Sequence, residues 1–184
     1  MTEKIYAAGK MFELVHATQP DGRVFEIARR APGVRVIIAD KIAKKLLLTK
    51  EFRRELNAYD FRLPGGKVFD SLAEFEAFRK TGNDIIVPAA AKAKAEAAEE
   101  AGMAVDTVTF YKKSTLGATV EWDLYVFEAS DFTDHADGQS LEEGEQIDDV
   151  GWYDFADVEQ MILRGDMQED RVALIVLRWI HSQK

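Results

Sequence analysis

The sequence contains no cysteine, which excludes disulfide bonds, thiolate catalysis and cysteine-ligated zinc or iron–sulfur sites. Long apolar runs are also absent. No stretch free of Asp, Glu, Lys and Arg exceeds seven residues, whereas a transmembrane helix needs about 20 apolar positions. The first ten residues show no apolar core of a signal peptide. We therefore expect a cytoplasmic protein with no membrane partner.

Charge is unevenly spread along the 184 residues, whose number suits a single domain. The formal net charge is −9. Residues 1–67 hold 14 basic and 8 acidic side chains, whereas residues 121–170 hold one basic and 17 acidic side chains. This asymmetry indicates one half suited to phosphate groups and another suited to cations. No basic stripe is interleaved with aromatic residues, so we expect no nucleic-acid partner.

Short apolar runs between turn residues predict strands, and helical periodicity with capping residues predicts helices. The expected strands are 11–18, 23–31, 34–39, 46–52, 59–63, 107–112, 120–127 and 150–153, and the expected helices are 71–81, 88–101, 155–163 and 170–181. An acidic loop is expected over 134–146. This order of strands and helices indicates an α+β fold or a three-layer sandwich.

Three carboxylates on the second expected helix are the first candidate for a chemical site. Glu96, Glu99 and Glu100 stand at i, i+3 and i+4, so they share one helical face. One interpretation is a solvated surface balanced by Lys92 and Lys94. The other is a site for a hard cation such as Mg²⁺, which prefers carboxylate and carbonyl oxygens.

A glycine pair favours the cation site. Leu63-Pro-Gly-Gly-Lys67 ends a predicted strand with two glycines, where the backbone can approach a ligand and offer carbonyl oxygens. Together with Ala95-Glu-Ala-Ala-Glu-Glu-Ala-Gly-Met103, this segment resembles the signature of Nudix hydrolases. The chain departs from the signature at Val87 and Ala95, which replace a glutamate and an arginine, and an insert of about residues 70–84 interrupts it.

Other segments resemble the ADP-ribose pyrophosphatase branch of that family. They are Thr49–Arg53, the acidic segment Glu143–Ile147, Arg164–Asp166 and the closing helix Ala173–His181. Arg62 stands where the branch usually has an acidic residue. The resemblance implies a Nudix-like α/β/α sandwich with a mixed sheet, N-terminal antiparallel strands and a helix inserted in the signature. It also implies N-terminal strands over 1–32, exchanged between subunits of a homodimer, and a catalytic domain over 33–184.

The resemblance further implies an activity and roles for particular residues. Mg²⁺, or Mn²⁺, would be held by the Gly65 carbonyl, Glu96, Glu100 and Glu145. Glu143 would act on the attacking water and Glu99 would assist, while Arg53 and Arg62 would bind phosphate. The substrate would be a nucleoside diphosphate joined to another moiety, with ADP-ribose or a nucleotide sugar first. The alternatives are a non-catalytic nucleotide-binding sensor or partner module, and an enzyme acting on small dinucleotides or sugar diphosphates.

Overall fold

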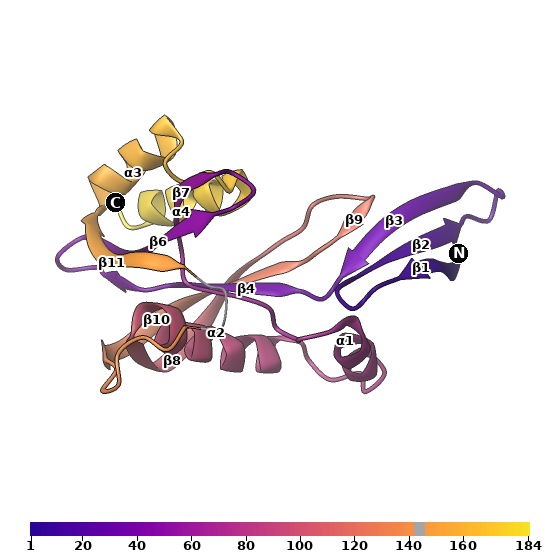
Figure 1. Cartoon of the computed structure of the whole chain (residues 1–184), viewed down its shortest axis with the longest axis horizontal. Coiled ribbons are helices and arrows are strands. Elements are labelled where there is room, and N and C mark those ends of the chain that lie inside the picture. Colours follow the sequence, from indigo (N-terminus) through magenta and orange to yellow (C-terminus); the bar gives the residue numbers. More distant parts are fainter. Residues whose placement is uncertain (142–145) are drawn as a thin grey trace.

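The computed structural model describes residues 1–141 and 146–184 and has an α+β fold (Figure 1). Its strands are β1 (Thr2–Ala8), β2 (Phe12–Thr18), β3 (Val24–Arg30), β4 (Gly33–Ile37), β5 (Ala39–Asp40), β6 (Lys45–Arg53), β7 (Ala58–Arg62), β8 (Met103–Ser114), β9 (Val120–Glu121), β10 (Leu124–Asp134) and β11 (Ile147–Asp154). Its helices are α1 (Leu72–Arg79), α2 (Ile86–Ala101), α3 (Phe155–Arg164) and α4 (Asp170–Ser182). None of the helices in the described ranges is long and apolar enough to span a membrane.

Two sheets form the centre of the molecule. In the first, β10 pairs in parallel with β4 and antiparallel with β8, so this sheet is mixed. In the second, β6 pairs antiparallel with β5, β7 and β11. Figure 1 shows α2 on one side of these strands and α3 with α4 on the other. The expected α/β/α arrangement with a mixed sheet is confirmed.

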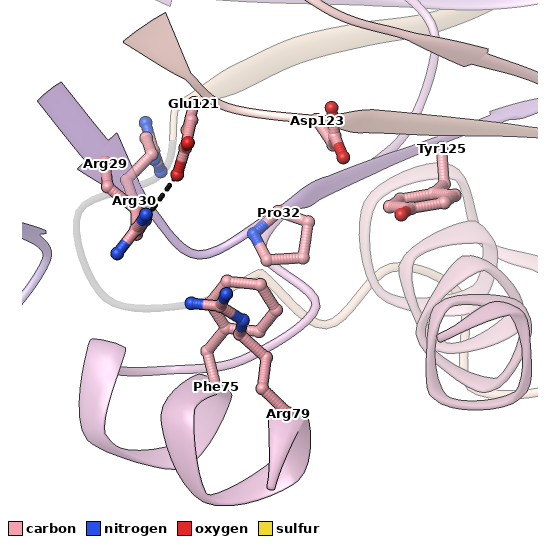
Figure 2. A pocket seen from close by; sticks show the side chains of 8 residues that line it. All are labelled: Arg29, Arg30, Pro32, Phe75, Arg79, Glu121, Asp123 and Tyr125. Carbon is pink, nitrogen blue, oxygen red and sulfur yellow. Dashed lines mark hydrogen bonds and ion pairs between the residues drawn. The ribbon is translucent and has the colours of Figure 1, made fainter. Parts of the chain in front are cut away.

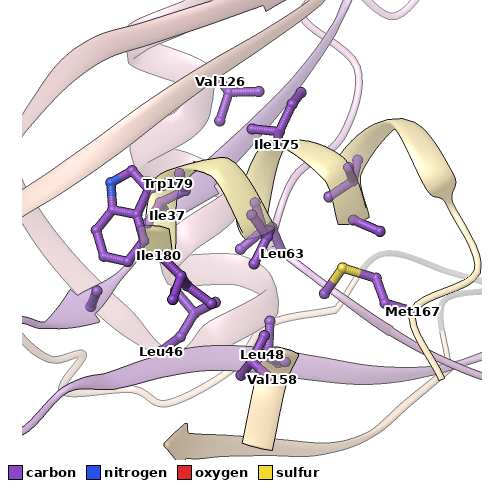
Figure 3. Close-up of a cluster of buried hydrophobic side chains, with 14 of the residues drawn as sticks. Ile37, Leu46, Leu48, Leu63, Val126, Val158, Met167, Ile175, Trp179 and Ile180 are labelled. Carbon is purple, nitrogen blue, oxygen red and sulfur yellow. The ribbon is translucent and has the colours of Figure 1, made fainter. Parts of the chain in front are cut away.

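The core follows from the two-residue period of the strands. Val34, Val36 and Ile38 pack with α2, whereas Ile37, between them, packs with α4. The α2 face is made of alanines at four-residue intervals, which lets the helix lie close to the strands: Ala89, Ala93, Ala97 and Ala101. The α4 face presents larger side chains at helical spacing, and Figure 3 shows Ile175, Trp179 and Ile180 among the strand residues.

The N-terminal strands form a separate sheet in the order β1-β2-β3-β9. Arg29 lies at its centre, 6% exposed, and makes ion pairs with Glu3, Glu13 and Glu121. The Glu121 pair ties β3 to β9. This sheet also has partners elsewhere in the chain: β3 pairs in parallel with β9, and the start of the insert contacts the turn between β1 and β2. One such contact is the hydrogen bond from the Leu72 amide to the Lys10 carbonyl, 3.0 Å long.

The insert folds as the expected short helix. The Ser71 hydroxyl accepts a hydrogen bond from the Glu74 amide at 3.2 Å, and the Glu74 carboxylate accepts one from the Asp70 amide at 3.1 Å. Phe69 packs against the ring of Phe78, with centroids 5.2 Å apart. The helix lies beside the N-terminal sheet, and Figure 2 shows the cavity of about 330 Å³ between them, with Phe75 on its wall.

Several element boundaries differ from those expected. Strand β1 lies before residue 11, where the first strand was expected to begin. The single strand expected over 120–127 is two strands, interrupted at Trp122 and Asp123, and the second continues to Asp134 into the expected acidic loop. Helix α2 begins at Ile86, two residues before Pro88, where the Asp84 carboxylate accepts a hydrogen bond from the Ile86 amide at 3.0 Å. The Asp84 side chain thus satisfies an amide of the first turn.

Candidate active site

The candidate site is a cavity of about 420 Å³ lined by β4, the end of β6, β7 and the loop after it, the last turn of α2, the end of β3 and the start of β10. Glu169, the residue directly before α4, also lines the cavity. Of the residues selected from the sequence, it brings together Arg53, Arg62, Gly65 and Glu100. The other lining residues are Arg30, Gly33, Arg35, Glu51, Glu55, Gly66, Lys67, Trp122, Leu124 and Glu169.

The glycine pair is held against both β4 and α2. The Val34 and Val36 amides donate hydrogen bonds of 2.9 Å to the Gly66 and Pro64 carbonyls. On the other side, the Gly65 amide donates a hydrogen bond of 2.6 Å to Glu100 Oε2. A Cβ at Gly65, whose φ is +152°, would lie 2.1 Å from the Val34 carbonyl oxygen. Only glycine fits at this position.

The two inward carboxylates of α2 lie next to this loop. Glu96 and Glu100 are 5% and 8% exposed. A Cβ at Gly66 would lie 2.0 Å from Glu96 Oε1, so the absence of a side chain there makes room for the carboxylate. Glu99 lies further out, with a side chain 36% exposed. Of the three glutamates, only Glu100 is among the residues that line the cavity.

Lys92 provides positive charge beside these carboxylates. Its Nζ lies 3.0 Å from Glu96 Oε1 and 3.1 Å from Glu99 Oε2. Burial lowers the pKa of Lys92, but its hydrogen bonds to Glu96 and Glu99 and their charges outweigh burial, so the pKa is raised above its usual value. The lysine is therefore fully charged at neutral pH.

The donor set suits Mg²⁺ or Mn²⁺. Mg²⁺ takes oxygen ligands and is usually bound by one or two carboxylates together with waters and substrate phosphates. Glu96, Glu100 and the backbone at Gly65 offer such oxygens, although the Gly65 carbonyl accepts a hydrogen bond from Arg35 Nη1 in this structure. Within residues 1–141 and 146–184, no group of three His, Asp or Glu residues is arranged to hold a metal ion. Glu143 and Glu145, predicted for this site, lie outside the described residues.

The two arginines selected for substrate binding are both ion-paired. Arg62 Nη2 lies 2.7 Å from Glu169 Oε2, and Arg62 Nε lies 2.9 Å from Asp60 Oδ2. Arg53 contacts Glu51 and Glu55, each at 2.7 Å. These pairs fix both guanidinium groups in the wall of the cavity.

Glu169 holds the basic side of the cavity together. Its carboxylate lies 2.7 Å from Arg62, 3.4 Å from Arg171 and 3.6 Å from Arg35. Burial alone would raise the pKa of Glu169, but the three guanidinium charges and the Arg171 hydrogen bond lower it below the usual value. No motif in the sequence singled out this residue, because two of its partners, Arg35 and Arg62, come from distant strands.

Arg30 is the guanidinium in this wall that pairs with no carboxylate in the described part of the chain. It stacks on Trp122 at 4.3 Å and on Phe12 at 5.0 Å, and its Nε is buried without a hydrogen-bond partner. Arg171 lies over the same Trp122 ring at 4.4 Å. Burial, and then the charge of Arg171, lower the pKa of Arg30. An anion in the cavity would relieve this repulsion.

Strand alternation separates Arg30 from its neighbour Arg29. Arg29 makes ion pairs with carboxylates of the N-terminal sheet, whereas Arg30 also lines the candidate site. Both side chains line the cavity beside the insert that Figure 2 shows. No motif in the sequence singled out Arg30. The two-residue period of β3 was the signal that could have told them apart.

One mixed sheet and one antiparallel sheet lie between α2 and the α3–α4 pair, which is the α/β/α arrangement expected from the sequence. Among solved structures, the chain is similar to a crystal structure described as an ADP compounds hydrolase, with a TM-score of 0.67 and 19% sequence identity. The match covers 100% of this chain and 94% of that one. No protein-family profile and no curated protein matches the sequence.

Proposed function

We propose that the protein is a divalent-cation-dependent hydrolase that cleaves the diphosphate bond of a nucleoside diphosphate joined to another moiety. ADP-ribose and nucleotide sugars are the first candidate substrates. The observation that carries the proposal is one cavity that joins the buried Glu100, bound to the Gly65 amide, to a wall of arginines. The fold it shares with a protein described as an ADP compounds hydrolase supports the same class of substrate.

Each group of residues has a task in this proposal. Glu96, Glu100 and the Gly65 carbonyl, with Glu145, would hold Mg²⁺ or Mn²⁺. The cation would supply positive charge to offset the diphosphate and would make a water more acidic. Arg53, Arg62 and Arg30 bind the phosphate oxygens by charge-assisted hydrogen bonds. Glu143 accepts the proton of the attacking water, and Glu99 supports the carboxylate face from outside the cavity.

A product assay tests the proposal. The protein is incubated with Mg²⁺ or Mn²⁺ and ADP-ribose, nucleotide sugars or dinucleotides, and the products are separated by chromatography. The expected result is cleavage of the diphosphate by the parent protein and a loss of at least about 10–100-fold in Glu100→Gln. Absence of cleavage across the panel would contradict the proposal.

Two further variants divide the roles of Glu143 and Glu145. Glu145→Gln should weaken metal binding, so added Mg²⁺ should restore part of the rate. Glu143→Gln should lower kcat by about 10²–10⁴-fold with metal affinity unchanged, because a general base acts in the transition state. If both variants keep activity within a few-fold of the parent, the base lies elsewhere.

A second candidate function is nucleotide binding without catalysis, as in a sensor or partner module. The Lys92 ammonium group contacts the carboxylates of Glu96 and Glu99, and the Arg35 guanidinium group contacts the Gly65 carbonyl. Positively charged side chains of the protein therefore already contact three of the proposed site residues. Calorimetric titration with ADP-ribose in Mg²⁺ distinguishes the two candidates. Binding without product would favour the module.

A further inference from the structure

Lys92 and Glu96 form an ion pair inside the proposed metal site. They lie one turn apart on α2, and their charged atoms are 3.0 Å apart. The Glu96 side chain is only 6% exposed and that of Lys92 is 23% exposed. A carboxylate this buried requires compensation of its charge. Ala95, directly before Glu96, carries no charge, and of the two lysines on α2 it is Lys92 that forms the ion pair with Glu96.

The position of the ammonium group places it in competition with a divalent cation. A Mg²⁺ ion would bind carboxylate oxygen at about 2.0–2.1 Å. The same oxygen, Glu96 Oε1, already lies within hydrogen-bond distance of Lys92 Nζ. Two cations on one oxygen would repel each other strongly at partial burial. Lys92 has a second carboxylate partner, Glu99, whose side chain is 36% exposed and can keep the ammonium group after it leaves Glu96.

We propose that Lys92 is a built-in cation that holds Glu96 in the metal-free protein and is displaced from it when a divalent ion binds. Lys92 thereby sets the metal affinity of the site and keeps the buried carboxylate compensated before the metal arrives. It is a positioning residue and has no contact with the substrate in this scheme. The inference rests on the proposed function, because it concerns a carboxylate assigned there to the metal.

Removal of the Lys92 charge should strengthen metal binding but destabilise the metal-free protein. In Lys92→Met the side chain keeps its length but the competitor is gone, so Mn²⁺ should bind about tenfold more tightly, the equivalent of one modest ion pair. The metal-free variant should melt at a lower temperature than the parent, because Glu96 loses its ion pair with Lys92. Added Mn²⁺ should then raise its melting temperature more than it raises that of the parent.

The chain offers a matched control on the same helix. Lys94 is exposed and donates its hydrogen bond to the Asp106 carbonyl, away from the carboxylate face. Lys94→Met removes the same charge from the same helix without removing a contact to Glu96 or Glu99. Lys92→Arg keeps the charge at the position and guards against a folding defect in Lys92→Met.

The experiment is calorimetric titration of the substrate-free full-length protein with Mn²⁺, together with thermal melts at each metal concentration. The inference predicts tighter binding only in Lys92→Met, with Lys94→Met and Lys92→Arg no tighter than the parent. Equal or weaker Mn²⁺ binding by Lys92→Met would overturn it, and so would an equal gain in Lys94→Met or Lys92→Arg. The proposed function fails separately, by absence of product in the chromatographic assay, whatever the ranking of these affinities.

Discussion

The Gly65 amide donates a 2.6 Å hydrogen bond to Glu100 Oε2 and so joins the loop after β7 to the last turn of α2. The two residues are 35 positions apart, and the insert with α1 lies between them in the chain. In Figure 1 that helix lies beside the N-terminal sheet, away from this contact. The insert therefore lengthens the chain between Gly65 and Glu100 and leaves the contact between the loop and the helix in place.

The two adjacent glycines should respond differently to alanine. In Gly65→Ala the new Cβ would meet backbone, the Val34 carbonyl oxygen, at 2.1 Å, so we expect severe loss of stability. In Gly66→Ala it would meet the end of the Glu96 side chain at 2.0 Å, which can move aside. Gly66→Ala should therefore fold but lose activity and Mn²⁺ affinity by about 10–100-fold.

Circular dichroism melts and Mn²⁺ titration separate these outcomes. Gly9→Ala is the control, since its Cβ would meet the Phe12 carbonyl oxygen at an ordinary 3.5 Å. A Gly66→Ala protein with normal Mn²⁺ affinity would show that the position of Glu96 does not matter to the site.

Arg30 should contribute to substrate binding. Arg30→Met keeps much of the apolar stem on Trp122 but removes the unpaired charge. Loss of a hydrogen bond to a charged group is worth about 1.5–3 kcal/mol, so KM should rise about 10–100-fold with kcat little changed. Steady-state kinetics measure KM and kcat separately. Arg54→Met, at an exposed turn next to Arg53, should leave KM unchanged. An equal effect at both positions would point to general surface charge.

Spacing along the sequence was enough to predict the carboxylate face and the close approach of the glycine pair. A helix turns about 100° per residue, so Glu96 and Glu100 fall on nearly the same line and enter the interior together, with Glu99 beside them on the outer flank. Their proposed roles stay predictions. The fold class was predicted because every central strand and helix carries a strong apolar pattern.

The arginine wall was not predictable in the same way. Glu169 gathers Arg35, Arg62 and Arg171 from two strands and a helix, and a single sequence does not show which distant charges meet. Trp122 lies within the single strand expected over 120–127. It interrupts that strand and is half-buried between two guanidinium groups, a packing that apolar periodicity does not encode.

Glu169 gives the protein a predictable response to acid. Its pKa in the folded protein lies below the usual value of about 4.3, so its contribution to stability is fully present above pH about 4.3. The contribution is lost as pH falls through the lower folded-state pKa. Glu169→Gln should therefore reduce the free energy of unfolding at pH 7 by about 2 kcal/mol, and the difference from the parent should shrink below pH about 4.

Urea denaturation at a series of pH values between neutral and acid measures this difference. Glu26→Gln is the matched control, because the Glu26 side chain is 70% exposed and contacts only His16 among the ion pairs of the described chain. A Glu169→Gln difference that stays constant down to the lowest pH would mean that the carboxylate contributes through its shape and not through its charge.

The N-terminal sheet should mediate a homodimer. All seven residues of β1 are exposed, and this strand lies at the edge of its sheet with a free row of backbone groups. Ile5 is 55% exposed on β1, and Phe12 on the neighbouring strand is 51% exposed.

A charge at the edge opposes strand pairing, so Ile5→Lys should convert a dimer into a monomer in light scattering at micromolar concentration. Ile42→Lys places the same charge at a 97% exposed position in the turn between β5 and β6 and should leave the dimer intact. A monomeric parent protein, or dissociation by both variants alike, would contradict this role for β1.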